Sequence, residues 1–142
     1  MQVRLRHPVP DDASSWEKLR CALWPDGVSD HGPEIASFFA GTLDDVAAVL
    51  IAEDESGAMV GFAELSIRTD LAGLEGKRVG YVEGLYILPE VRRRGLVRKL
   101  LQASRNWAYR QDCAAFASDR AERIIIDRSF AAKRLRSGQS QL

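Results

Sequence analysis

The residues best suited to chemistry concentrate in an arginine-rich turn. VRRRG at 91 to 95 follows an apolar run that ends at Pro89, and an amphipathic stretch follows the glycine directly. A helix that begins at such a turn presents unpaired backbone N–H groups and about half a positive charge. Gly95 permits close approach of a ligand, and the guanidinium groups add cationic donors. The pattern predicts an anion site suited to a pyrophosphate.

Other phosphate-binding motifs do not occur in the sequence. It contains neither GxxxxGKS, GxxxxGKT nor GxGxxG, which disfavours a nucleoside triphosphate or a dinucleotide as the ligand.

Charge is distributed unevenly along a chain whose formal net charge is zero. Residues 21 to 67 contain no Lys or Arg but nine carboxylates, whereas thirteen Lys or Arg occur from residue 91 onward. A fold that brings these regions to opposite sides of one cleft favours a cation on one side and an anion on the other. Two solvated faces of opposite charge are the plain alternative.

Composition predicts one globular domain over residues 1 to 142. The chain is 46% hydrophobic and contains three Trp, which is enough for a buried core. Cys21 and Cys113 are far apart in sequence, so we expect no disulfide framework and no bound metal. The sequence has no signal-like start and no apolar stretch of membrane-spanning length, which predicts a cytoplasmic protein without a membrane partner.

Hydrophobic periodicity predicts the elements that must position these residues. Strands are expected at 2 to 6, at 46 to 54 and 59 to 69 as a hairpin, at 79 to 89 and at 113 to 118. Helices are expected from Ala13 to about Trp24, from Pro33 or Glu34 to about Leu43, and from 94 to 111. This order predicts an α+β fold in which helices flank a mixed, mostly antiparallel sheet.

Two adjoining features resemble the GCN5-related N-acetyltransferase (GNAT) superfamily. RRRGLV at 92 to 97 resembles its acetyl-CoA-binding signature, which is Gln or Arg, two residues, Gly, one residue, then Gly or Ala; Val97 departs at the last position. EGLYILPEVRRRG at 83 to 95 has strand, proline and arginine-rich turn at the spacing of that superfamily. The resemblance implies the GNAT fold and transfer of an acetyl group from acetyl-CoA to an amine.

The resemblance also implies where acetyl-CoA binds. The strand at 79 to 89 would splay from its neighbour at 113 to 118, and the pantetheine arm would lie in the gap as an extra strand. Gly80 and Gly84 indicate a bulge or a close backbone approach, with ordinary packing as the alternative. The expected cofactor-binding residues are Leu85, Tyr86, Ile87, Arg92, Arg93, Arg94, Gly95, Leu96, Val97 and Arg98.

Three pieces of the chain resemble the aminoglycoside 6'-N-acetyltransferases within that superfamily. They are RCALWPDGVSDHGPEI at 20 to 35, GFAELSIR at 61 to 68 with YVEGLYILPEVRRRG at 81 to 95, and WAYRQDCAAFASD at 107 to 119. An aminoglycoside carries several ammonium groups, which the carboxylates of the lysine-free region could hold. The resemblance implies sugar binding by Trp24, Asp26, His31, Glu34, Glu83 and Asp119.

Glu83 and Asp119 are the expected catalytic residues. An ammonium cannot attack a thioester, so a base such as Glu83 must take its proton directly or through one water, while Asp119 could hold the same ammonium. The plain alternatives are a solvated strand glutamate, a helix-capping aspartate and, for Trp24, a core tryptophan. The implied mechanism is direct attack, with the oxyanion stabilised by a backbone N–H near Leu85 or Tyr86.

No covalent enzyme intermediate is expected from this mechanism. Cys21 and Cys113 have no base assigned to them, and we expect both to be buried bystanders.

Residues 120 to 142 depart from the family pattern. RAERIIIDRSFAAKRLRSGQSQL contains no Tyr and no LGF turn, and it is too short for the helix and two strands with which the family closes its sheet. We expect one basic helix from about Ala121 to Leu135 instead. The hypothesis is that the C-terminal strands are missing or altered and that a homodimer covers the exposed edge.

Three other functions stay open. A GNAT N-acetyltransferase could act on a protein, peptide or polyamine amine, although a peptide acceptor would not need so many carboxylates. A nucleic-acid-binding surface is disfavoured because no aromatic platform or recognised motif accompanies the arginines, so no nucleic-acid partner is expected. A catalytically impaired scaffold would result if the altered C-terminus shapes the acceptor site.

Overall fold

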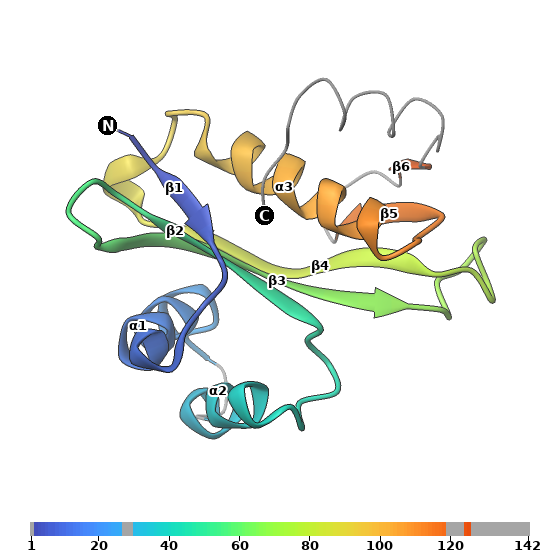
Figure 1. Ribbon diagram of the computed structural model, residues 1–142, viewed down its shortest axis with the longest axis horizontal. Coiled ribbons are helices and arrows are strands. Elements are labelled where there is room, and N and C mark those ends of the chain that lie inside the picture. The colour runs from blue at the N-terminus through green and yellow to red at the C-terminus, as the bar shows by residue number, and fades with distance from the viewer. Residues whose placement is uncertain (1, 27–29, 119–123, 126–142) are drawn as a thin grey trace.

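The computed structural model describes residues 2 to 26, 30 to 118 and 124 to 125. Figure 1 shows one sheet with two helices on one face and a third helix on the other. The helices are α1 (Ala13–Leu23), α2 (His31–Ala40) and α3 (Leu96–Arg110), with short 3-10 turns η1 (Pro10–Asp12) and η2 (Pro89–Val91). The strands are β1 (Arg4–Arg6), β2 (Ala48–Glu53), β3 (Met59–Arg68), β4 (Val79–Ile87), β5 (Ala115–Ser118) and β6 (Ile124–Ile125).

The sheet follows chain order from β1 to β6. Strands β1 to β4 pair antiparallel, β5 joins β4 in parallel after the crossover through α3, and β6 pairs antiparallel with β5. The predicted α+β fold with a mixed, mostly antiparallel sheet is confirmed.

Strand β4 changes its pairing halfway along. Glu64 lies opposite Gly84 and Leu65 lies opposite Val82, so Glu83 is an extra residue that forms a β-bulge. Parallel pairing with β5 covers only Val79 to Val82. Within the described residues, the part of β4 from Glu83 to Ile87 therefore pairs with β3 alone, as the predicted splay requires.

Apolar residues fill both faces of the sheet. On one face the α3 side chains Leu100 and Trp107 join a buried cluster with strand residues such as Leu65 and Val82. The approach is so close that a Cβ added at Gly80 would lie 2.4 Å from that of Ala108, so glycine is required there.

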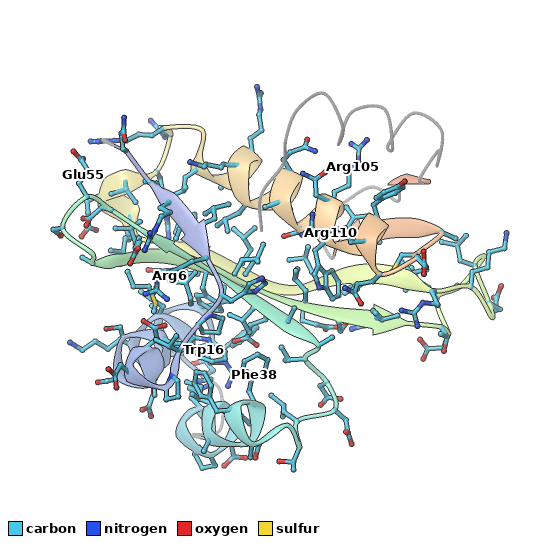
Figure 2. All side chains as sticks on the ribbon, viewed as in Figure 1. Arg6, Trp16, Phe38, Glu55, Arg105 and Arg110 are labelled. Carbon is cyan, nitrogen blue, oxygen red and sulfur yellow. The ribbon has the colours of Figure 1, made fainter. Side chains whose placement is uncertain are left out.

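The opposite face is covered by α1 and α2. Trp16 and Phe38, labelled in Figure 2, meet edge to face with ring centroids 5.4 Å apart. Such aromatic pairs bury much apolar area, and they fix α1 and α2 together over β2 and β3.

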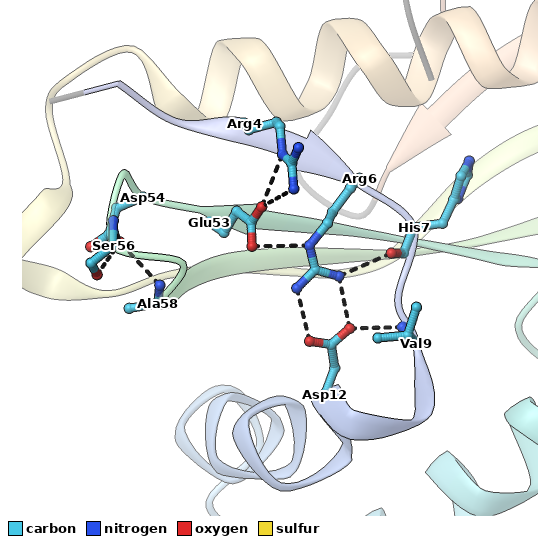
Figure 3. A network of polar contacts seen from close by, with 9 residues as sticks. All are labelled: Arg4, Arg6, His7, Val9, Asp12, Glu53, Asp54, Ser56 and Ala58. Carbon is cyan, nitrogen blue, oxygen red and sulfur yellow. Dashed lines mark hydrogen bonds and ion pairs between the residues drawn. The ribbon is translucent and has the colours of Figure 1, made fainter.

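Arg6 at the end of β1 ties three elements together, as Figure 3 shows. Its guanidinium makes a two-pronged contact with Asp12 of η1, at 2.8 and 2.9 Å, and pairs with Glu53 of β2 at 3.0 Å. Arg4 also pairs with Glu53. These contacts fix the entry into α1 against the edge of the sheet.

Two sequence-based predictions need correction. Helix α2 begins at His31 rather than at Pro33 or Glu34, because a proline in the first helical turn loses no hydrogen bond there, and it ends at Ala40 with Gly41 in the left-handed region at φ 76°. The helix expected over 121 to 135 is wrong at Ile124–Ile125, which form β6 on the edge of β5. The rest of that segment lies outside the described residues.

Candidate active site

The turn between β4 and α3 has the geometry of an anion site. Gly95 is the N-cap of α3 at φ 77°, and Arg93 also has a positive φ of 66°, a strained conformation for a residue with a side chain. The first turn of α3 has no side-chain cap and no acidic residue. Among the described residues, no atom would come within 4 Å of a Cβ added at Gly95, so this part of the chain leaves open space over the start of the helix. An anion can approach its N–H groups directly.

The arginines of this turn have different environments. Arg92 donates from Nε to the carbonyl oxygen of Ile87 at 2.8 Å and lies 5.3 Å from the ring centroid of Tyr86, so it fastens the turn to the end of β4. Arg93, Arg94 and Arg98 are exposed and can reach a bound anion.

The two residues that follow Gly95 also differ. The Leu96 side chain is buried in the core, which leaves only its backbone to contact a ligand. Val97, the departure from the signature, is 41% exposed and points away from the core.

A hollow of about 540 Å³ opens beside the bulge of β4. Three carboxylates line it besides Glu83: Asp44 and Asp45 after α2, and Asp70 after β3. Ser66 and Arg68 of β3 complete its polar wall. Four carboxylates against one guanidinium make this hollow a place where a polycation is favoured.

Glu83 projects into this hollow and already has partners. Its carboxylate accepts hydrogen bonds from Ser66 Oγ at 2.5 Å and from Arg68 Nε and Nη2 at 2.8 and 2.7 Å. Its side chain is 24% exposed. Pairing with Glu83 raises the pKa of Arg68 above its already high ordinary value, so this guanidinium is always charged. Glu83 is therefore partly solvated, as in the plain alternative considered above, but its carboxylate is also paired within the protein.

Trp24, His31 and Glu34 come together around Arg20 of α1. The rings of Trp24 and His31 stack with centroids 6.2 Å apart, and Arg20 lies 5.1 Å from the centroid of the Trp24 ring. Arg20 Nη1 donates to Glu34 at 2.8 Å and lies 3.3 Å from His31 Nδ1. Of the expected sugar-binding residues, these three share one cluster.

Glu64 of β3 fixes Arg20 in that cluster. It is 1% exposed and accepts hydrogen bonds from Arg20 Nε at 2.7 Å and from Trp16 Nε1 at 2.9 Å. Burial by itself would lower the pKa of Arg20, but the carboxylates of Glu64 and Glu34 raise it overall, so the guanidinium stays charged inside the protein. His31 and Glu34 therefore have a structural partner, which leaves less of each for a ligand.

The other expected site residues lie elsewhere. Asp26 is exposed beyond the end of α1, and Asp119 lies outside the described residues. Sequence reasoning missed Arg20, Ser66, Arg68 and Asp70 as site residues. The sequence does offer one signal for two of them. Arg20 is the last cation before the region without Lys or Arg, and Arg68 is the first cation after it.

Two further expectations concern sulfur and metal. Cys113 is buried as expected, whereas Cys21 is exposed because it lies on the outer side of α1, which corrects the prediction for that residue. In the described part of the chain, no group of three or more His, Cys, Asp or Glu is arranged around a metal position. No helix of those residues is long and apolar enough to cross a membrane.

Comparison with known proteins agrees with this geometry. Residues 13 to 124 match the model of the acetyltransferase (GNAT) family, and this range includes α1, the strands β2 to β5 and the turn before α3. The chain therefore belongs to the acetyltransferase (GNAT) family.

Similar relatives within the family share one activity by name. The chain is 44% identical over 109 residues to aminoglycoside N(6')-acetyltransferase type 1 of Klebsiella aerogenes, covering 76% of this chain and 72% of the relative. It is 38% identical over 116 residues to the enzyme of that name from Stenotrophomonas maltophilia, covering 81% and 73%.

Solved structures give the same picture. The aminoglycoside 6'-N-acetyltransferase AAC(6')-Ih of Acinetobacter baumannii superposes with a TM-score of 0.73 at 27% identity, covering 99% of this chain and 92% of that one. AAC(6')-Iy in complex with the bisubstrate analogue CoA-S-monomethyl-acetylneamine superposes with a TM-score of 0.72 at 26% identity, covering 100% and 92%.

Proposed function

We propose that this protein is an aminoglycoside 6'-N-acetyltransferase, which transfers the acetyl group of acetyl-CoA to the 6'-amine of an aminoglycoside and so confers resistance to the antibiotic. The observation that carries the proposal is the position of Glu83. Its carboxylate lies in an acidic hollow at the point where β4 loses its pairing with β5. This position supports Glu83 as the base, because the hollow there adjoins the expected path of the coenzyme. The names of the similar relatives support the same activity.

In this proposal acetyl-CoA binds along β4 and over Gly95. The diphosphate lies on the N–H groups at the start of α3, where no side chain competes for them, with Arg93, Arg94 and Arg98 as cationic partners. The pantetheine arm pairs with the open edge of Leu85 to Ile87. The thioester then ends close to the bulge at Glu83.

The acceptor binds in the hollow beside Glu83. Several ammonium groups of one sugar antibiotic can pair with Asp44, Asp45 and Asp70 at once, which a single lysine or N-terminal amine cannot do. Trp24 adds an aromatic face beside Gly84, which its ring touches so closely that a Cβ there would lie 2.6 Å from it. A protein, peptide or polyamine acceptor is the alternative outcome of the assay below.

The reaction needs one base and one oxyanion donor. Glu83 removes a proton from the 6'-ammonium, directly or through water, and the freed amine attacks the thioester carbonyl carbon. The carbonyl oxygen takes the negative charge and is stabilised by a backbone N–H near Leu85 or Tyr86. Collapse of this intermediate breaks the C–S bond and releases coenzyme A as a thiolate, and the extra proton of the attacking nitrogen passes to the thiolate sulfur as the amide forms. Asp119 is proposed to hold the acceptor amine during these steps.

Three broader assignments belong to the same proposal. The domain acts in the cytoplasm, binds neither nucleic acid nor membrane, and forms a homodimer. Size-exclusion chromatography with light scattering measures the last of these.

The proposal is tested by removing the base. Glu83→Gln keeps the shape and the hydrogen bond from Ser66 but cannot accept a proton, so we expect kcat with kanamycin to fall by about 100-fold or more. Thiol release from acetyl-CoA measures the rate, and calorimetry should give an unchanged Kd for acetyl-CoA. Glu55→Gln removes an equal charge from the exposed β2–β3 hairpin and should leave kcat unaltered.

Three results would count against the assignment. Wild-type protein that acetylates spermidine or peptides but not kanamycin has a different acceptor. Protein that binds acetyl-CoA without any turnover is an inactive scaffold. Full activity in Glu83→Gln excludes this carboxylate as the base.

A further inference from the structure

Glu83 is occupied in the free protein by a cation that belongs to the chain itself. The guanidinium of Arg68 meets its carboxylate through two parallel hydrogen bonds, at 2.8 and 2.7 Å. Ser66 Oγ donates a third hydrogen bond to the Glu83 carboxylate. A carboxylate has about four acceptor positions, so an incoming ammonium with its three donors finds little of Glu83 available.

We infer that Arg68 takes the place of the acceptor's ammonium on Glu83 in the free protein and is exchanged for that ammonium when the acceptor binds. The inference rests on the proposed function, because it concerns the cation that Glu83 is to deprotonate. It makes Arg68 a specificity-determining residue, beyond the roles given to the site above.

The surroundings of Arg68 allow such an exchange. Its side chain lines the hollow and is 39% exposed, whereas the side chain of Arg20 is 6% exposed. The guanidinium stacks on the ring of Tyr81 at 3.9 Å from the centroid, and this contact can persist while the hydrogen bonds to Glu83 break. Asp70 lines the same hollow and offers the released guanidinium a second carboxylate.

The β-bulge explains why the two groups meet. Arg68 lies opposite Val79, and Tyr81 lies opposite Ser66, so all of these share one face of the sheet. The extra residue at 83 places its carboxylate on that same face, within reach of an arginine that extends past the Tyr81 ring.

Exchange of this kind selects for acceptors with several charges. A single ammonium forms an ion pair with Glu83 that is about as stable as the pair with Arg68. Replacing Arg68 therefore adds little to the binding free energy of an acceptor with one charge. A polycation pairs at the same time with Asp44 and Asp45, and those contacts offset the loss of the Arg68 pair. Arg68 thereby disfavours amines that carry one charge, such as a protein lysine.

The test compares kanamycin binding by calorimetry at one salt concentration in wild type, Arg68→Gln and Arg68→Lys. Arg68→Gln removes the competitor, so we expect its Kd for kanamycin to fall about three- to tenfold, with kcat changed little and the Kd for acetyl-CoA unchanged. Arg68→Lys keeps the charge but loses the two-pronged pair, and should give a smaller gain. Arg4→Gln removes an exposed cation at the edge strand and should not alter the Kd for kanamycin.

Each outcome decides the matter. A Kd for kanamycin that is unchanged or higher in Arg68→Gln overturns the exchange. A gain in Arg68→Gln with none in Arg68→Lys also overturns it, because a general effect of charge would then suffice. If Arg68→Gln does not fold, Arg68→Lys alone carries the test. Failure of every variant and of wild type to bind kanamycin refutes the proposed function as well, whereas wild-type binding without a gain refutes the exchange only.

Discussion

Single residues in this protein form two arginine–glutamate pairs with opposite exposure. Arg20 and Glu64 are closed off between α1 and the sheet, with side chains 6% and 1% exposed. Arg68 and Glu83 lie on the same face of the sheet with side chains 39% and 24% exposed. Separating a buried pair leaves an unpaired charge inside the protein, whereas an exposed pair can exchange partners because water solvates the separated charges. The Arg20–Glu64 pair stabilises the fold, whereas we propose that the Arg68–Glu83 pair exchanges its arginine for a ligand.

This difference predicts how the buried pair responds to substitution. Glu64→Gln leaves the buried Arg20 guanidinium paired with Glu34 but puts a neutral group in place of its second carboxylate, and it weakens the acceptor of Trp16 Nε1, so the free energy of unfolding should drop by about 3 kcal/mol. Urea unfolding followed by tryptophan fluorescence measures the change. Glu17→Gln on the exposed side of α1 is the matched control and should change stability by less than about 0.5 kcal/mol. Equal stabilities of the two variants would show that Glu64 is not needed for the fold.

At this scale the sequence predicts which residue types matter better than it predicts their partners. Glu83 as a site residue follows from its place in the strand, and the structure places it in the acidic hollow. Its neighbour Arg68 is fifteen positions away and reaches it only through the β3–β4 register, which no local pattern encodes. The family resemblance predicts that His31 and Glu34 bind the sugar, and nothing in the sequence reveals that Arg20 turns toward them.

Among the elements, the turn before α3 and the β2–β3 hairpin use glycine in the same conformation. Gly95 has φ 77° and Gly57 has φ 86°, and in both cases an added Cβ would have no atom of the described part of the chain within 4 Å. Alanine at either position should therefore lower the free energy of unfolding by about 1 kcal/mol, through backbone strain alone.

Only Gly95 is expected to affect the coenzyme. The methyl group of Gly95→Ala would enter the open space over the start of α3, so we expect the Kd for acetyl-CoA to rise about tenfold, whereas Gly57→Ala should leave it unchanged. Calorimetric titration of both variants measures this difference. Identical Kd values would mean that the coenzyme does not approach the start of α3.

Most elements could be predicted because their apolar residues recur with a clear period. The hairpin, the central strand and the helix after Gly95 have the expected order, with ends that shift by a few residues. The start of α2 was missed because a proline near a helix start is compatible with both a helix and a loop. The short β6 was missed because three consecutive isoleucines have no period that distinguishes strand from helix.

The stability of the whole molecule should depend on pH through the contacts of Arg6. The hydrogen bonds from Arg6 lower the pKa of the Asp12 carboxyl below its ordinary 3.8, and those from Arg6 and Arg4 lower the pKa of Glu53 below 4.5. The folded protein therefore holds these protons less tightly than the unfolded chain does. The stabilisation is complete above the ordinary pKa values and is lost as the pH falls through the lower, folded ones.

Arg6→Gln tests this dependence. At pH 7 we expect it to lower the free energy of unfolding by about 2 kcal/mol, and the difference from wild type should shrink below about pH 4 as the carboxyls are protonated. Urea unfolding at several pH values measures both quantities. Arg78→Gln is the control, because Arg78 donates to the backbone oxygen of Gln111 and not to a carboxylate, so its effect should not vary over this range. A difference that stays constant down to pH 3 would contradict the assignment.

The bulge in β4 also determines how this protein can change by insertion and deletion. Two stretches of regular pairing with β3 flank Glu83, which has no partner in the register. The offset between these stretches decides which face of the sheet the Glu83 side chain is on. Loss of Val82 would bring that glutamate opposite Leu65, on the side that packs against α3. On the proposed function, a change of one codon in length would abolish the chemistry while every proposed site residue is still encoded, so the spacing along β4 would matter as much as the residues themselves.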